Sequence, residues 1–248
     1  MKFDVHDGKG EFKMKRKYPW QYDDMKQVGV DYSSISEVEA YDEQMTKLRD
    51  VKRETENAIE LLGIGPDDLV AEFGTGTGEF CLEVAKHCKR VIGIDVSDKM
   101  LEYARDKMKQ RGIVNIDFIH GSFLTYQHSG TPIDFVITQL ALHHLPDFWK
   151  QIALNRIYAI LREGGTFYLK DTVYSFDANQ YEEFFEQWIS GTKALAGEEL
   201  AQDVTTAVRE EFSTCDWIME ELLRRAGFTI QQVEYDQGFL AQYVCKKD

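Results

Sequence analysis

The chain has 248 residues, which suffices for one α/β domain with additions but not for two large domains. Its net charge of −14 and pI near 4.9 argue against binding to long stretches of nucleic acid or to anionic membrane surfaces, since both bind basic proteins preferentially. No apolar run approaches the roughly 18 residues that span a membrane and no signal peptide is evident, so we expect a cytoplasmic protein. The cysteines form no C-x-x-C pair, and Cys81 and Cys88 are expected to be buried thiols rather than metal ligands or a disulfide.

Residues 1–36 show no clear periodicity and are interpreted as an N-terminal arm, separate from the domain that residues 37–248 form. A basic cluster at residues 13–17 precedes an aromatic group, Tyr18, Trp20, Tyr22 and Tyr32. Two interpretations are open. The arm either packs its aromatic rings on the domain surface, or forms a flap whose rings exclude water from an active site and contact substrate.

A helical pattern and a glycine-rich turn follow the arm. Apolar residues recur at three- and four-residue steps between Glu37 and Leu62, which predicts an amphipathic helix that ends at Gly63. Residues 69–73 then read as a short buried strand. Three glycines at alternate positions and a further helical pattern come next, so this stretch predicts a strand, a tight turn and a helix (Gly74, Gly76, Gly78).

Three further strands alternate with helices along the chain. Residues 90–95 end in Asp95, and Ser97 is placed to cap the next helix. Residues 116–119 lead into Gly121-Ser122-Phe123, and residues 133–138 lead into the run from Gln139 to Pro146. A helix is predicted over 148–161, stopped by Gly164-Gly165, before a fifth strand at 166–170 that Asp171 closes. This alternation predicts a parallel sheet covered on both faces, with ligands at the carboxyl ends of its strands.

The alternation breaks between residues 173 and 212, where two aromatic-rich helical patterns form an insertion. It is either a helical cover that packs on the domain or a lid over the substrate, to which Trp188 would contribute. Residues 213–216 then have capping-box spacing before another helix. The strands expected at 229–235 and 239–245 are joined by Asp236-Gln237-Gly238 and therefore predict an antiparallel hairpin.

The residues around the glycines narrow the choice of ligand. A dinucleotide site needs a third glycine three residues after the second, and Glu79 stands at that position, where an acid would face any pyrophosphate. The Gly-Lys-Ser/Thr of a phosphate-binding loop is absent. Glu72, just before the turn, would repel a phosphate but suits a ligand that carries an ammonium group.

The run from Glu72 to Gly78, followed by Asp95 at the end of the next strand, resembles the class I S-adenosylmethionine-dependent methyltransferases. The resemblance covers roughly residues 55–248. It implies a Rossmann-like α/β fold, with a seven-stranded, mostly parallel sheet whose last strand is antiparallel and with helices on both faces. It also implies S-adenosylmethionine as cofactor and S-adenosylhomocysteine as product.

The resemblance assigns expected roles to individual residues. Asp95 would accept hydrogen bonds from both ribose hydroxyls, Glu72 would lie near the amine, and Met100 and Phe123 would sandwich the adenine. Ser122 stands where many relatives carry an aspartate that bonds the adenine amine, so that contact falls to Ser122 or to a backbone group. The remaining residues expected to contact the cofactor surround these positions (Gly74, Thr75, Gly76, Gly78, Val96, Gln139).

The acceptor site is expected just past the fourth strand, at His143 and His144. Either histidine would serve as a base or would position the acceptor, because transfer from an activated sulfonium depends largely on in-line placement in a dry site. Signatures of amino-methylating DNA enzymes, cytosine-C5 enzymes and metal-assisted catechol-type enzymes are missing, and no metal site is predicted. We therefore expect a small-molecule substrate, without nucleic acid or membrane as partner.

Three alternatives remain at this point. The first is a tRNA-modifying methyltransferase, because wobble-uridine methyltransferases resemble this layout. The second is a protein that binds S-adenosylmethionine without turnover. The third is an NAD-dependent oxidoreductase. The sequence leaves the identity of the acceptor and the oligomeric state open.

Overall fold

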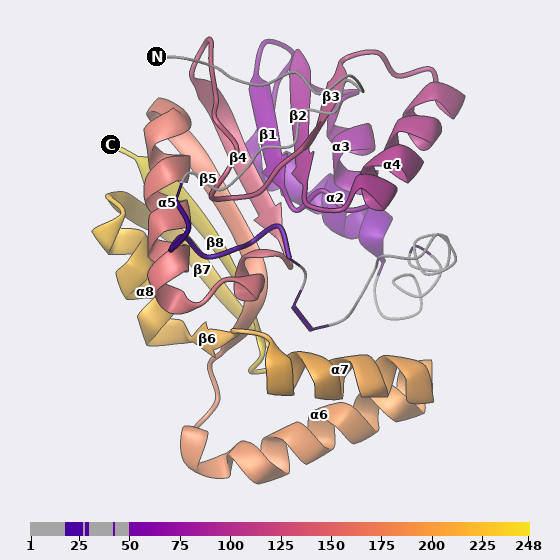
Figure 1. The fold of residues 1–248 in the computed structure, drawn as a ribbon, viewed down its shortest axis with the longest axis vertical. Helices are drawn as coiled ribbons and strands as arrows, with labels where there is room; N and C mark the ends of the chain where they lie inside the picture. Colours follow the sequence, from indigo (N-terminus) through magenta and orange to yellow (C-terminus); the bar gives the residue numbers. More distant parts are fainter. Residues whose placement is uncertain (1–17, 27, 30–41, 43–49) are drawn as a thin grey trace.

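The computed structural model describes residues 18–26, 28, 29, 42 and 50–248. In these residues a twisted sheet has the strand order β3-β2-β1-β4-β5-β8-β7, and the short strand β6 pairs with the C-terminal end of β5 (Figure 1). The strands are β1 Leu69–Phe73, β2 Arg90–Asp95, β3 Ile116–His120, β4 Ile133–Gln139, β5 Leu161–Tyr174, β6 Thr214–Cys215, β7 Phe228–Asp236 and β8 Leu240–Lys247. β8 runs antiparallel to both of its neighbours, so the predicted seven-stranded arrangement is confirmed and one short strand is added to it.

Helices cover both faces of the sheet, as predicted. The helices are α2 Val51–Leu62, α3 Glu79–Val84, α4 Asp98–Gln110, α5 Asp147–Ile160, α6 Tyr181–Ala196, α7 Glu198–Glu210 and α8 Asp216–Arg225, with 3-10 turns η1 Leu142–His144 and η2 Ala178–Gln180. On one face α2 and α3 pack on alternate strand residues such as Val70 and Ile137. On the other face α5 and α8 pack on the intervening residues, such as Ala71 and Val136. This alternation is the period of two that a strand buried on both faces requires.

The predicted insertion forms the helical pair α6–α7. Figure 1 shows the pair projecting beyond the end of β5, away from the sheet. Aromatic rings fix it to its neighbours: Trp188 stacks on Phe239 of the hairpin at 4.0 Å, and Phe184 stacks on Phe176, which follows β5, at 3.8 Å between centroids. The hairpin turn itself has positive φ at Gln237 and Gly238, the backbone form that tight antiparallel turns favour.

Three predicted boundaries are wrong. Asp50 caps a helix that begins at Val51, by accepting the Arg53 N–H at 3.0 Å, so no single helix runs unbroken from 37 to 62; most of residues 37–49 lie outside the described residues. The helix expected to reach Leu161 ends at Ile160, and Gly164-Gly165 lies inside β5, where the register to β4 shifts.

The third wrong boundary is the capping box at 213–216. Thr214 and Cys215 form β6, which pairs with Val173 and Tyr174, and Cys215 precedes α8 without a side-chain cap. Thr214 and Cys215 are therefore extended because they pair with β5, although the sequence spacing predicted a helix cap there. Cys81 and Cys88 are buried free thiols, as expected. None of the helices in the described ranges is both long enough and apolar enough to cross a bilayer.

Candidate active site

The turn between β1 and α3 holds three glycines in left-handed backbone conformations. Gly74, Gly76 and Gly78 have φ values of 73°, 53° and 79°. A Cβ at Gly74 would lie 2.3 Å from the Cβ of Ala141, so this glycine lets the turn approach the segment after β4. A Cβ at Gly76 would meet nothing within 4 Å. Gly76 therefore borders open space, where the backbone is accessible to a ligand.

Gly78 and Glu79, at the end of this turn, contact helix α4 and not the pocket. A Cβ at Gly78 would lie 2.9 Å from the Cβ of Ala104, so the glycine allows α4 to pack closely. Glu79 pairs with Lys107 at 2.6 Å and with Arg111 at 2.9 Å, both from α4, and these cations lower the pKa of its carboxyl. Glu79 therefore forms ion pairs with α4 and does not line the pocket.

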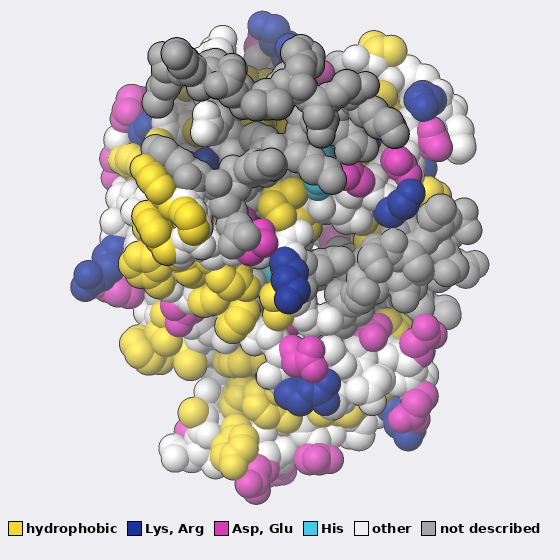
Figure 2. Space-filling view, in the orientation of Figure 1, with side chains coloured by type: hydrophobic (Ala, Val, Ile, Leu, Met, Phe, Trp, Pro, Cys, Tyr) yellow, Lys and Arg dark blue, Asp and Glu magenta, His cyan; other side chains and the backbone are white. Residues whose placement is uncertain are grey.

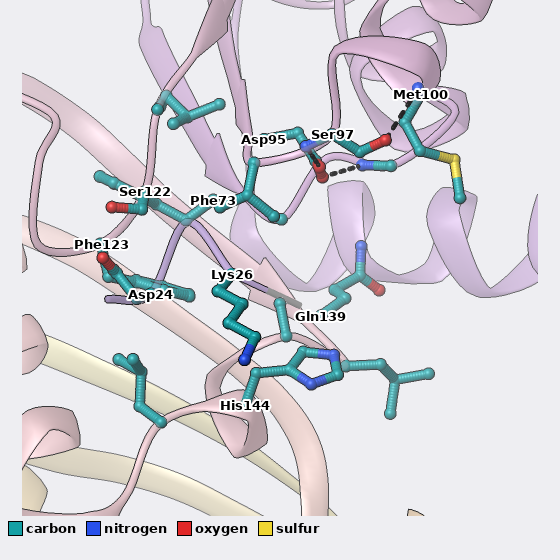
Figure 3. Close-up of a pocket in the computed structure, with 18 residues that line it drawn as sticks. Asp24, Lys26, Phe73, Asp95, Ser97, Met100, Ser122, Phe123, Gln139 and His144 are labelled. Atoms are coloured by element: carbon teal, nitrogen blue, oxygen red, sulfur yellow. Dashed lines mark hydrogen bonds between the residues drawn. The ribbon is translucent and has the colours of Figure 1, made fainter. Parts of the chain in front are cut away.

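Asp95 ends β2 beside this turn. One carboxylate oxygen accepts the Gly76 N–H at 2.7 Å and the other accepts the Ser97 N–H at 2.8 Å (Figure 3). Burial raises the pKa of Asp95, while these backbone N–H groups act in the opposite direction. The Val96 N–H also bonds to it, so the carboxylate is held rigidly at the end of the strand, and its two oxygens together still have acceptor capacity for a ligand.

A pocket opens above the carboxyl ends of β1, β2 and β4, and about 880 Å³ of empty space, continuous with solvent, lies between its lining residues. Many of the residues predicted from the sequence line it, namely Gly74, Gly76, Asp95, Val96, Met100, Ser122, Phe123, Gln139 and His144. Figure 3 shows them arranged around one space, with Asp95 and Met100 on one side and His144 on the other.

Glu72 lies beneath the glycine turn and does not line the pocket. Its carboxyl accepts hydrogen bonds from the Thr75 hydroxyl at 2.7 Å and from the Cys81 thiol at 3.1 Å, and Gln139 also bonds to it. Burial raises the pKa of Glu72 to about 7 against these bonds. Thr75 likewise faces inward, so these two predicted cofactor contacts support the turn from below.

The N-terminal arm contributes two pocket residues that the sequence did not indicate, Asp24 and Lys26. One Asp24 oxygen accepts the Leu124 N–H at 3.0 Å, next to Ser122. The other Asp24 oxygen is buried and has no hydrogen-bond partner among the described residues. Figure 3 shows Lys26 on the His144 side of the pocket. No local pattern marked these residues, since only the fold brings the arm to the sheet.

The four aromatic residues predicted to contact substrate do not line the pocket. Tyr18 and Trp20 stack on each other at 4.9 Å, and Trp20 is 71% exposed. Tyr22 packs near Trp149, 6.2 Å between ring centroids, and Trp188 lies against Phe239. In the structure these rings pack on the surface or on the domain, and Asp24 and Lys26, which follow the aromatic residues of the arm, reach the pocket instead.

The two histidines after β4 differ in their surroundings. His143 is buried and does not line the pocket; its Nδ1 bonds to the Asp171 carboxylate, and its backbone N–H donates to the other Asp171 oxygen at 3.0 Å. Asp171 and Glu211 together raise the pKa of His143 against the effect of burial. His144 faces the pocket, and burial lowers its pKa to about 3, so its ring is neutral. Of the two, His144 is the one within reach of a pocket ligand.

Two backbone features hold this region in place. Leu140 has a φ of 52°, a left-handed conformation that costs a non-glycine residue about 1–2 kcal/mol. Its N–H donates to Lys170 O at 2.8 Å, which stabilises the turn that leads to the histidines. Gly29 also has positive φ, and a Cβ there would lie 2.2 Å from a carboxylate oxygen of Glu211. The arm and the end of α7 thus meet beside the histidines.

The known proteins that resemble this chain in sequence are methyltransferases. Residues 70–165 match the model of a family described as a methyltransferase domain. The chain is 31% identical over 192 residues to an uncharacterized methyltransferase of Geobacillus kaustophilus (strain HTA426), an alignment that covers 77% of this chain and 82% of that protein.

Two solved structures show the same fold. A S-adenosylmethionine-dependent methyltransferase from Clostridium acetobutylicum ATCC 824 superposes with a TM-score of 0.62 at 12% identity, over 84% of this chain and 96% of the other. The mycolic acid cyclopropane synthase CmaA1, solved with SAH and CTAB, superposes with a TM-score of 0.61 at 12% identity, over 79% of this chain and 83% of the other. At these identities the likeness concerns the fold alone.

Proposed function

This chain belongs to the class I S-adenosylmethionine-dependent methyltransferases, and from that premise we propose that it methylates a small-molecule acceptor by in-line displacement. The family confirms the cofactor and the reaction class expected from the glycine turn and Asp95. The class of acceptor, which the family leaves open, has to be inferred from the pocket.

The residues of the pocket fit the cofactor. Gly76 leaves open space beside the backbone, Asp95 offers carboxylate oxygens that can accept ribose hydroxyls, and Met100 and Phe123 offer apolar surface for a base. When bound, S-adenosylmethionine supplies a methyl group on an already activated sulfonium. Catalysis by the chain then consists mainly of holding the acceptor in line and excluding water.

The scarcity of basic side chains around the pocket is the observation that supports a small acceptor. Asp24 and Lys26 of the arm close one side of it, and Lys26 is the single Lys or Arg among its described lining residues. Figure 2 shows Lys and Arg side chains scattered among Asp and Glu on the coloured part of this face, without a continuous basic patch. An RNA-binding groove requires such a patch.

We assign His144 to positioning of the acceptor. It lines the pocket across from Asp95, and its neutral ring offers a contact surface to an acceptor. Asp24 and Lys26 of the arm would restrict entry of water to the same space. His143 is not given this role, because both of its ring nitrogens face carboxylates.

The test is methyl transfer from S-adenosylmethionine labelled in its methyl group. The protein is incubated separately with a metabolite extract below about 1 kDa, a ligand size class that such pockets hold, and with bulk tRNA. We expect label in the small-molecule fraction and none in tRNA. Label in tRNA would establish the tRNA-modifying alternative, and cofactor binding without transfer to either fraction would establish a binding protein without turnover.

A further inference from the structure

Four side chains from distant parts of the chain meet on the His144 side of the pocket. They are His143 and His144 from η1, Asp171 from β5, and Glu211 just after α7. His143 Nε2 lies 3.3 Å from one Glu211 oxygen, and His144 Nδ1 lies 3.9 Å from the other. Ligand atoms from both histidines and the glutamate all lie within 4.8 Å of one another.

Each histidine directs one ring nitrogen toward the Glu211 carboxylate. His143 uses Nδ1 for the bond to Asp171, which leaves Nε2 facing Glu211. The His144 ring bonds to the backbone of Val28, while its Nδ1 is buried and has no hydrogen-bond partner among the described residues. Metal-binding histidines have this arrangement, in which a carboxylate or carbonyl on one nitrogen orients the other.

We propose that His143, His144 and Glu211 bind a divalent transition-metal ion, with Asp171 orienting His143. Ligand atoms about 2.0–2.1 Å from a tetrahedral ion are about 3.4 Å apart, so the observed separations need only small side-chain movements. Two imidazoles with one carboxylate suit Zn²⁺ or a similar ion, whereas Mg²⁺ and Ca²⁺ prefer sites made of oxygen.

The ion would have an open position on the pocket side. Three protein ligands leave a fourth position free, which is the feature that separates catalytic zinc sites from closed structural ones. His144 lines the pocket, so a ligand in the pocket can reach the ion. The site would thus hold an acceptor that carries an oxygen, nitrogen or sulfur donor, a consequence that rests on the proposed function. Metal binding itself does not.

A metal-free arrangement of the same residues is the competing explanation. A doubly protonated His143 between Asp171 and Glu211 would satisfy both carboxylates. It would leave His144 Nδ1 without a partner, whereas an ion occupies all three groups. The neighbouring cation Lys150 is engaged elsewhere, with Asp147 at 2.7 Å and with the Phe212 carbonyl.

Spectroscopy of the full-length, tag-free protein with Co²⁺ tests the site, because Co²⁺ reports its coordination by visible absorption. We expect one Co²⁺ per chain with the intense absorption of low coordination number, displaced by Zn²⁺. Absence of saturable, stoichiometric binding to the wild-type protein would overturn the proposal and would favour the doubly protonated histidine.

Variants locate the site. Glu211→Gln keeps the size of the side chain and removes the carboxylate, and Asp171→Asn weakens only the orientation of His143. We expect Co²⁺ affinity to fall at least about 100-fold in the first and about 10- to 100-fold in the second. His87→Ala is the matched control, since His87 is exposed and remote in sequence from the cluster, and it should bind as wild type.

Calorimetry with S-adenosylmethionine separates the two proposals. Each variant should bind the cofactor as wild type does, which also shows that it is folded. Unchanged Co²⁺ binding in Glu211→Gln would place the ion elsewhere and contradict the site. Metal binding without methyl transfer to small molecules would leave the site standing and contradict the proposed function.

Discussion

The pocket has two halves that are built differently. The donor half, Gly74 to Gly78 with Asp95, comes from two adjacent strands and lies within 22 residues of sequence. The acceptor half joins the arm at Asp24 to Gly29, η1, the end of β5 and Glu211. A donor site of one family can be recognised locally, while a site for a varying acceptor is assembled from segments that each change independently. Substitutions in each half should therefore affect different ligands.

The largest expected effect is loss of the donor on Gly76→Val. The backbone at φ 53° disfavours a branched side chain, which would also fill the open space beside the turn. Affinity for S-adenosylmethionine by calorimetry should fall at least about 100-fold, or about 2.7 kcal/mol. Gly112→Val is the control, because Gly112 has a similar φ of 67° and open surroundings outside the pocket. Equal losses in both variants would point to instability.

The support beneath the donor half should respond to pH through Glu72. Its pKa is raised to about 7, so the native carboxyl holds a proton that the unfolded one releases near 4.5. The native state therefore loses stability as pH rises from about 4.5 to 7. A shift of this size corresponds to about 3 kcal/mol.

Glu72→Gln should remove this loss. Urea unfolding of the cofactor-free protein would show Glu72→Gln more stable than wild type at pH 8 and little different at pH 4. Glu60→Gln on the exposed face of α2 is the control. The same pH slope in wild type and Glu72→Gln would show that Glu72 is not buried as an acid.

Asp95→Ala should weaken binding of the methyl donor, because hydrogen bonds to a charged carboxylate are lost. The expected loss of binding free energy is about 1.5–3 kcal/mol, or roughly 10- to 150-fold. Asp98→Ala removes a more exposed acid three residues along, with a side chain 62% exposed, and should leave affinity close to wild type. Calorimetry would contradict the role of Asp95 if both variants bound equally well.

Gly29→Ala should affect the acceptor half alone. An added Cβ would lie 2.2 Å from the Glu211 carboxylate and would push it from the histidines. We expect Co²⁺ affinity to fall about tenfold while S-adenosylmethionine affinity stays unchanged. Gly130→Ala has comparable strain at φ 115° in open surroundings and should keep Co²⁺ affinity. Equal Co²⁺ binding in both variants would show that Glu211 is not a ligand.

The smallest effect is expected for Trp20→Ala. Trp20 is largely exposed and does not line the pocket, so methyl transfer should change by less than about twofold, as for most surface substitutions. A larger loss, measured with the labelled cofactor, would restore the prediction that the arm's aromatic rings contact substrate.

The sequence predicted the family and the fold because hydrophobic periodicity and the glycine turn are local signals. Asp95, Gly76 and Met100 follow strands whose ends must meet in a parallel sheet, so their place at the pocket could be predicted too. The surroundings of Glu79 could not, since Lys107 and Arg111 lie a helix away.

Tertiary contacts explain the remaining differences. Asp24 and Lys26 reach the pocket because the arm is anchored to Leu124, a contact across 100 residues. Glu211 faces His143 because α6 and α7 bring the chain back to this place. Residues 214–215 form β6 in place of the predicted cap because β5 extends far enough to pair with them. No spacing within the chain indicates these pairings.

A paired titration of Gly76→Val and Glu211→Gln tests most directly whether the two halves are separate. Each variant is titrated with S-adenosylmethionine and with Co²⁺ under the same conditions. We predict that Gly76→Val loses the cofactor and keeps Co²⁺, and that Glu211→Gln keeps the cofactor and loses Co²⁺. Loss of both ligands in both folded variants, or of neither ligand in either, would contradict the division of the pocket into donor and acceptor halves.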